Sequence, residues 1–93
     1  MKVARIGVLA EGDVAAQETA STLASALGAT ATDAEDESVD LLVVGSREGT
    51  PEGRVELSAS AEYEIATATS PVLVVPRGKA VRFAAPAPAL SGA

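Results

Sequence analysis

Residues 39–76 constrain the fold of this chain more than any other stretch. Their sequence, VDLLVVGSREGTPEGRVELSASAEYEIATATSPVLVVP, indicates an apolar strand, a glycine-bearing loop, a helix and a second apolar strand. In a parallel sheet, such a loop lies at the carboxyl end of a strand and at the amino end of a helix. Phosphate often binds at a corner of this kind, because free helix N–H groups and the helix dipole favour an anion. The stretch therefore predicts an architecture and a candidate site together.

Both strands of this stretch are continuous apolar runs, at 40–45 (DLLVVG) and 71–75 (PVLVV). Runs of this kind are typical of strands that are covered on both faces, as in parallel sheets. Between them the sequence predicts a helix over 55–69, because four apolar residues recur at helical spacing: Leu57, Ala61, Ile65 and Ala68.

The amino-terminal part predicts a strand at 3–10 (VARIGVLA) and then a helix at 14–27. Asp13 is the expected N-cap of this helix, because its side chain can accept from the free N–H groups of the first turn. Gly28 is the expected left-handed residue that ends the helix.

Residues 29–38 leave alternatives open. A parallel strand at 29–32 would need a crossover of about a dozen residues before the next parallel strand. Only about seven residues are available before Asp40. We therefore expect 29–32 to be irregular, an edge segment or an antiparallel strand, and the acidic residues 33–37 to form a solvated loop.

The expected fold is α/β, a small open parallel sheet with crossover helices and a β-α-β-α-β core, as in Rossmann-like domains. If the strands lie in chain order, both helices cover the same face, and a second subunit or the tail must cover the bare face. We expect one domain over 1–78 and a Pro/Ala-rich tail over 79–93. The tail composition predicts disorder, although Val81 and Phe83 could dock on the domain.

The composition predicts a thin core. The 93-residue chain has one Phe, one Tyr and no Trp, so the core must rest on Val, Leu, Ile and Ala. The strand at 71–76 is apolar and would be an edge, which favours pairing with a second copy. We therefore expect a homodimer, through this edge or through the bare sheet face.

Charge and missing residue types exclude several classes of function. The net charge of −6 disfavours nucleic acid and anionic membranes as partners. The chain has no Cys and no His, which excludes disulfides, thiol or histidine catalysis and the usual zinc ligand sets. No metal site is predicted. No apolar run approaches the roughly 18 residues of a membrane span, and a cytoplasmic location is the default expectation.

Three stretches together resemble the universal stress protein family: RIGVLAEGD at 5–13, VDLLVVGSR at 39–47 and AEYEIATATSPVLVVP at 61–76. The resemblance implies a Rossmann-like stress-response protein that dimerises through its last strand. It also implies ATP or AMP as the ligand, as in the nucleotide-binding members. The chain is shorter than typical members, and a strand–helix–strand–helix portion is expected to be missing between Gly28 and Val39.

The nucleotide-binding members carry three spaced glycines followed by Ser or Thr, and this chain matches that pattern only at its first position. The four positions are occupied by Gly45, Glu48, Ser58 and Ala59. Glycines there would let backbone N–H groups approach phosphate, whereas the charge of Glu48 repels phosphate. The candidate nucleotide site comprises Glu11, Gly12, Gly45, Ser46, Arg47, Ser58 and Ser60.

Several of these residues also have a structural interpretation. Glu11 could meet an adenine or a ribose, or it could belong to an acidic turn that favours the helix amino terminus. Ser46 and Arg47 could contact phosphate or a partner's acid, or they could cap the loop and face solvent. No nucleophile–base pair is visible, so no catalytic residue is predicted.

Two hypotheses about function follow. The first is a non-enzymatic, dimeric stress-response or regulatory module with weakened or lost ATP binding and no cofactor. The second is an adenine-nucleotide sensor that binds ATP or AMP with the loop after the 40–45 strand.

Overall fold

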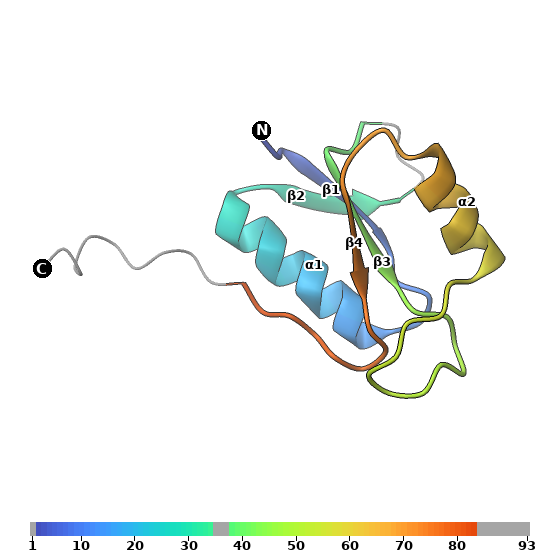
Figure 1. The fold of residues 1–93 in the computed structure, drawn as a ribbon. Coiled ribbons are helices and arrows are strands. Elements are labelled where there is room, and N and C mark those ends of the chain that lie inside the picture. The colour runs from blue at the N-terminus through green and yellow to red at the C-terminus, as the bar shows by residue number, and fades with distance from the viewer. Residues whose placement is uncertain (1, 35–37, 84–93) are drawn as a thin grey trace, which may run out of the picture.

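A computed structural model describes residues 2–34 and 38–83 of the chain. Its elements follow the order β1 (Arg5–Leu9), α1 (Val14–Leu27), β2 (Thr30–Asp33), β3 (Leu41–Gly45), α2 (Ala59–Thr67) and β4 (Val72–Val75). All four strands are parallel and lie in the order β2-β1-β3-β4 (Figure 1). The predicted fold class is confirmed, with one strand more than in the predicted core.

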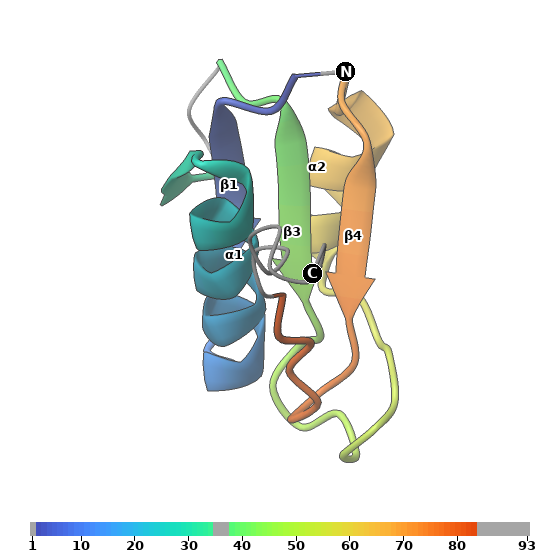
Figure 2. The same ribbon diagram turned by 90° about the vertical axis from the view of Figure 1, so that its left-hand side faces the viewer.

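The two helices cover opposite faces of the sheet (Figure 2). Ile6, Val43 and Val75 belong to the core cluster on the α1 face, whereas Leu42 and Val44 belong to the cluster on the α2 face. This arrangement corrects the expectation of strands in chain order with one bare face. Because β1 lies between β2 and β3, the two helical crossovers run in opposite directions, and crossovers of one handedness then lie on opposite faces.

β2 lies at one edge of the sheet, which is one of the alternatives expected for 29–32, whereas the irregular and antiparallel alternatives are wrong because it pairs parallel to β1. The connection from β2 to β3 comprises only the seven residues 34–40. Fully extended, a segment of this length spans about 25 Å, whereas two strand spacings amount to about 10 Å. The rule of a dozen residues does not apply here, because β2 is so short that an extended segment can return across β1.

This connection passes over β1 at Gly7. The glycine lies on the α2 face, in register with Leu42. A Cβ on Gly7 would lie 2.9 Å from Val39 Cγ1 and 3.3 Å from the Cα of Ala34. The described residues on either side of this connection, Ala34 and Val39, therefore lie against the backbone of β1 on the α2 face.

The first helix begins and ends as predicted. The Asp13 carboxylate caps α1, and Gly28 ends it with a φ of 67°. The second helix begins later than predicted, at Ala59. Its first turn is capped by the Ser58 hydroxyl, so residues 55–57 remain in the preceding loop.

After β4 the chain turns back and runs along α1 (Figures 1 and 2). We call residues 79–83 the strap. Ala80 and Phe83 of the strap pack against the core cluster of the α1 face. The first part of the predicted tail is therefore docked on the domain. Residues 84–93 of that tail, like residues 35–37 of the acidic loop, lie outside the described residues.

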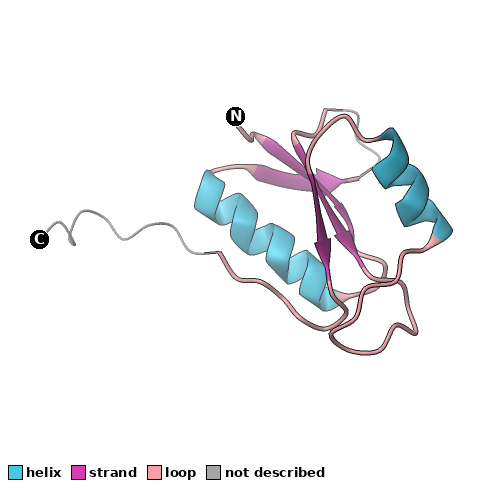
Figure 3. Cartoon of the chain, in the orientation of Figure 1, coloured by secondary structure: helices cyan, strands magenta, loops and turns pink. Residues whose placement is uncertain are grey.

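Three segments meet at the carboxyl end of the sheet: the turn after β1, the long loop 46–58 and the turn after β4 (Figure 3). This is the corner that the sequence predicts as a binding site.

Candidate functional site

The corner brings several predicted site residues together, and their polar groups bond to one another. Ser46 follows β3 directly and is fully buried. Its hydroxyl donates to the carbonyl oxygens of Val75, at 3.0 Å, and Arg54, at 3.2 Å. The hydroxyl thereby joins β4 to the loop 46–58 and is not directed toward solvent.

The amino end of α2 is occupied by a carboxylate of the chain itself. Ser58 accepts a hydrogen bond from the N–H of Ala61 at 3.0 Å and donates its hydroxyl proton to Glu11 Oε1. Glu11 has a left-handed backbone, with a φ of 55°, and is half-buried. Since a helix amino terminus stabilises negative charge, Glu11 fills the role that the sequence offers to a phosphate.

The two glycines of the predicted site serve close approaches within the protein. A Cβ on Gly45 would lie 2.4 Å from the carbonyl oxygen of Ala10 and 2.9 Å from Ala16 Cβ. The absent side chain at Gly45 therefore makes room for the β1–α1 turn. A Cβ on Gly12 would lie 2.7 Å from Glu48 Oε2, so the Glu48 carboxylate lies against the turn that was expected to meet an adenine or a ribose.

The remaining two predicted residues lie at the margin of the corner. The Arg47 guanidinium pairs with Glu56, with Nη2 at 2.9 Å and Nε at 3.1 Å from Oε1. Both side chains are largely exposed, and such pairs contribute little to stability. Ser60 lies on the first turn of α2 and lines a separate surface hollow with Leu9 and Tyr63.

Arg77 is a central residue of the corner that the sequence reasoning did not include in the site. Its Nη1 donates to the carbonyl oxygens of Glu11, at 3.1 Å, and Ser46, at 3.2 Å. Its backbone N–H donates to the carbonyl oxygen of Arg54, and its carbonyl accepts from Gly53. One side chain and its backbone thus connect all three loops. Its position two residues after the end of β4 was the available signal, since the carboxyl ends of parallel strands share one edge.

Asp13 completes the corner on the α1 side. This side chain is buried, with Oδ1 accepting from the N–H of Ala15 and Oδ2 from that of Gly78, both at 3.0 Å. The corner therefore holds three carboxylates, of Glu11, Asp13 and Glu48, that are already engaged in or packed against the fold. Such a site favours loop closure over the binding of a free anion.

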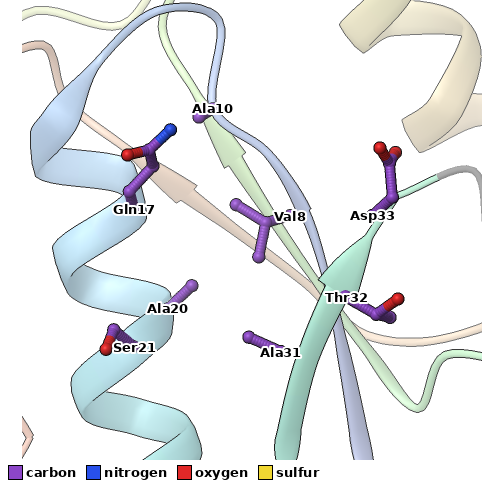
Figure 4. A pocket seen from close by; sticks show the side chains of 8 residues that line it. All are labelled: Val8, Ala10, Gln17, Ala20, Ser21, Ala31, Thr32 and Asp33. Atoms are coloured by element: carbon purple, nitrogen blue, oxygen red, sulfur yellow. The ribbon is translucent and has the colours of Figure 1, made fainter.

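A cleft of about 320 Å³ lies one strand away from the corner, between α1 and the carboxyl ends of β1 and β2 (Figure 4). Alanines at 10, 20 and 31 leave this space open, and Val8 forms its centre. The rim carries the polar side chains of Gln17, Ser21 and Asp33, whereas the Thr32 side chain points away from α1. Its apolar floor and polar rim suit a small, compact molecule, and Asp33 disfavours an anion. No sequence pattern points to this cleft, because the cleft depends on the parallel pairing of β2.

Within the described residues, the structure shows neither a metal-binding cluster nor a membrane-spanning helix. Among residues 2–34 and 38–83, no group of three or more Asp and Glu side chains is arranged to hold a metal ion. In the same part of the chain, no helix has the length and apolar character needed to cross a membrane.

No known family model matches the chain, and neither characterised proteins nor solved structures gave a match.

Proposed function

We propose that this protein is a universal stress protein-like regulatory module, non-enzymatic and homodimeric, that does not bind ATP at its loop corner. One observation carries the proposal: the amino end of α2 already holds the Glu11 carboxylate through Ser58. The hydroxyl of Ser46 is likewise engaged. A nucleotide would have to displace these contacts and overcome the charges of Glu11 and Glu48 before its phosphates could approach the helix.

The dimer is proposed at the free edge of β4. The sheet order leaves β4 at one end of the sheet, and no described strand pairs with its outer edge. Its sequence is VLVV, and three of its four side chains are only half-buried. An apolar edge strand of this kind favours pairing with an identical strand. The other route to a dimer, through a bare sheet face, loses its basis because each face carries a helix.

Isothermal titration calorimetry with Mg-ATP and with AMP tests the loss of nucleotide binding. We expect no saturable heat at micromolar to millimolar ligand. Glu11→Gln combined with Glu48→Gly removes two charges and frees the loop, and a gain of millimolar ATP binding in this variant is expected. Glu64→Gln combined with Glu62→Gln removes the same charge from α2 and should produce no gain. Micromolar ATP binding by the unmodified chain would contradict the proposal.

Light scattering over a concentration series tests the dimer separately. Val74 belongs to neither core cluster, so Val74→Lys places a charge on the β4 edge at small cost to the fold. We expect a concentration-dependent dimer that Val74→Lys weakens by about tenfold or more. A chain that stays monomeric at millimolar concentration would contradict the dimer without affecting the nucleotide result.

The cleft in Figure 4 favours a second candidate function, a sensor of an uncharged small molecule such as a nucleoside. This site differs from the loop after the 40–45 strand, where the sequence places the adenine-nucleotide sensor. An adenine ring could lie on the alanine-lined floor with its polar edge toward Gln17. In this case calorimetry would detect adenosine more strongly than AMP, because Asp33 disfavours an anion. Ala31→Leu, which fills the cleft, would abolish the signal. The exposed Ala66→Leu on α2 is the matched control.

A further inference from the structure

The strap is held on α1 by side chains that accept its backbone N–H groups. The N–H of Val81 donates to Thr19 Oγ1 at 2.8 Å, and the N–H of Phe83 donates to Thr22 Oγ1 at 3.0 Å. The strap therefore lies on α1 as an extended chain that is recognised mainly through its backbone.

Thr19 is suited to this task. It is fully buried, and its hydroxyl donates to the carbonyl oxygen of Ala15 at 2.8 Å. Its oxygen is then left as an acceptor on the strap side, where only Val81 uses it. Since the proton of this hydroxyl is already donated within α1, its lone pair is free to accept a backbone N–H of an extended chain.

Side chains add to the contact. Ala80 and Phe83 pack against the α1-face core, and Arg82 forms an ion pair with Glu18 of α1. We call the surface that receives them the α1 groove; it comprises Glu18, Thr19, Thr22 and the adjoining core. Figure 2 shows the strap beside α1, near the carboxyl end of β3.

The strap is attached to the rest of the domain by few backbone hydrogen bonds. Within the described residues, its one backbone–backbone hydrogen bond is the turn bond from Lys79 N to the carbonyl of Pro76. Segments with few backbone bonds and small apolar contacts open at lower free energy than the body of a domain. Gly78 is the hinge, with a φ of 73° that side chains rarely adopt.

We propose that the α1 groove also receives the strap of a second copy, so that two copies exchange residues 79–83. The exchanged strap makes the same contacts as the strap within one chain, and only the hinge differs. A strap from a second copy fits the α1 groove, because the same five residues already occupy that groove within one chain. Strap exchange is independent of pairing at the β4 edge.

Cysteine pairing tests the exchange directly, because the natural chain has no cysteine. Glu18→Cys chains and Arg82→Cys chains are mixed in equal amounts under mild oxidation, and disulfide-linked species are weighed by intact mass spectrometry. We expect mixed dimers well above the level seen when Arg82→Cys is mixed with Glu64→Cys, which lies on α2. A yield equal to that control would overturn the proposal.

The hinge supplies a second test. Gly78→Ala strains the hinge in the left-handed conformation that it has when the strap lies on its own chain, but not in an extended conformation. Two hinges are relieved of this strain in each exchanged dimer, so the association constant of dimerisation should rise about tenfold or more. Gly28→Ala imposes similar strain at a φ of 67° with no contact within 4 Å, and it should leave the constant unchanged. An equal response to both variants would contradict exchange.

Two more variants separate the exchange from the β4 edge. In the Gly78→Ala chain, Val74→Lys should leave the exchanged dimer intact, whereas Thr19→Val combined with Thr22→Val should abolish it. Thr67→Val is the matched control, because that hydroxyl bonds only within α2. If Val74→Lys dissociated the Gly78→Ala dimer and the two threonine replacements did not, that dimer would be assigned to the β4 edge and strap exchange would be overturned.

Discussion

The two faces of the sheet are covered in different ways. On the α1 face, a helix of 14 residues buries six of them, and the strap lies beside it. On the α2 face, a helix of nine residues buries only Ala61, and the connection over Gly7 supplies further cover. A face can therefore be covered by one long helix with local caps or by short pieces that depend on close backbone contacts.

The two helices also differ in whether their caps come from residues close in sequence or depend on distant ones. α1 has a buried carboxylate cap, Asp13, and a left-handed glycine, Gly28, at its two ends. α2 takes its cap from Ser58, whose hydroxyl also bonds to the distant Glu11. We expect the α1 face to contribute more to stability and the α2 face to respond more to changes in its long-range contacts.

Replacing a glycine by alanine on each face of the sheet should cause the largest losses of folding stability. Gly45→Ala places a Cβ 2.4 Å from a backbone oxygen, which cannot move alone, so we expect a loss of about 3 kcal/mol or more. Gly7→Ala meets the side chain of Val39 first and should cost about 1–3 kcal/mol. Urea unfolding measures both. A larger loss at Gly7 would reverse the comparison of the two faces.

Truncating neighbouring valines compares the packing of the faces. Val43 and Val44 are adjacent in β3 and both fully buried, Val43 on the α1 face and Val44 on the α2 face. Val43→Ala should cost about 2–3 kcal/mol and Val44→Ala about 1–2 kcal/mol, because the α1-face cluster is larger. Equal losses in thermal or urea unfolding would show that the two clusters are packed equally well.

The two helix caps should differ by less. Asp13→Ala removes acceptors for the N–H groups of Ala15 and Gly78, and we expect a loss of about 2 kcal/mol. Ser58→Ala removes one cap bond, and we expect about 1 kcal/mol. Circular dichroism during urea unfolding measures both variants. If Ser58→Ala were the costlier change, its bond to Glu11 would be more important than the cap.

The smallest change in stability is expected on lowering the pH, through Asp40 at the end of the β2–β3 connection. Asp40 Oδ2 accepts from the N–H groups of Ala4 and Arg5 at 2.9 and 3.1 Å, and these bonds lower the pKa of its carboxyl below the usual 3.8. The stabilisation is therefore complete above about pH 4 and lost as the pH falls through the lowered pKa.

Asp40→Asn tests this effect. The amide keeps an acceptor oxygen but does not titrate, so the stability of the variant should fall less steeply below about pH 4 than that of the natural chain. Unfolding by urea at a series of pH values measures the slope. Identical slopes would show that other carboxylates determine the acid sensitivity.

The sequence predicted the elements with strong local signals. The bounds of α1 follow from its two caps and its apolar spacing, and β3 and β4 follow from continuous apolar runs. β2 was left among several alternatives because its four residues, TATD, have no apolar pattern, and its parallel pairing was not expected because its connection to β3 is unusually short. The late start of α2 was missed because Leu57 continues the helical spacing although it lies before the Ser58 cap.

The site was predictable in its position but not in its chemistry. Parallel topology alone brings Glu11, Ser46 and Ser58 to one corner, as expected. The sequence does not show that these groups bond to one another and to the backbone, since each contact joins residues far apart in the chain. Whether a hydroxyl is available to a ligand depends on that geometry.

The length of the connection between β2 and β3 determines which residue can stand at position 7. While only seven residues join β2 to β3, position 7 has to remain glycine, because Val39 and Ala34 lie against it. If a longer connection rose away from the sheet, the same position could carry a methyl group or a larger apolar side chain at no cost. An insertion after Ala34 should therefore rescue Gly7→Ala, which makes loop length and residue size at this point interchangeable solutions to one packing problem.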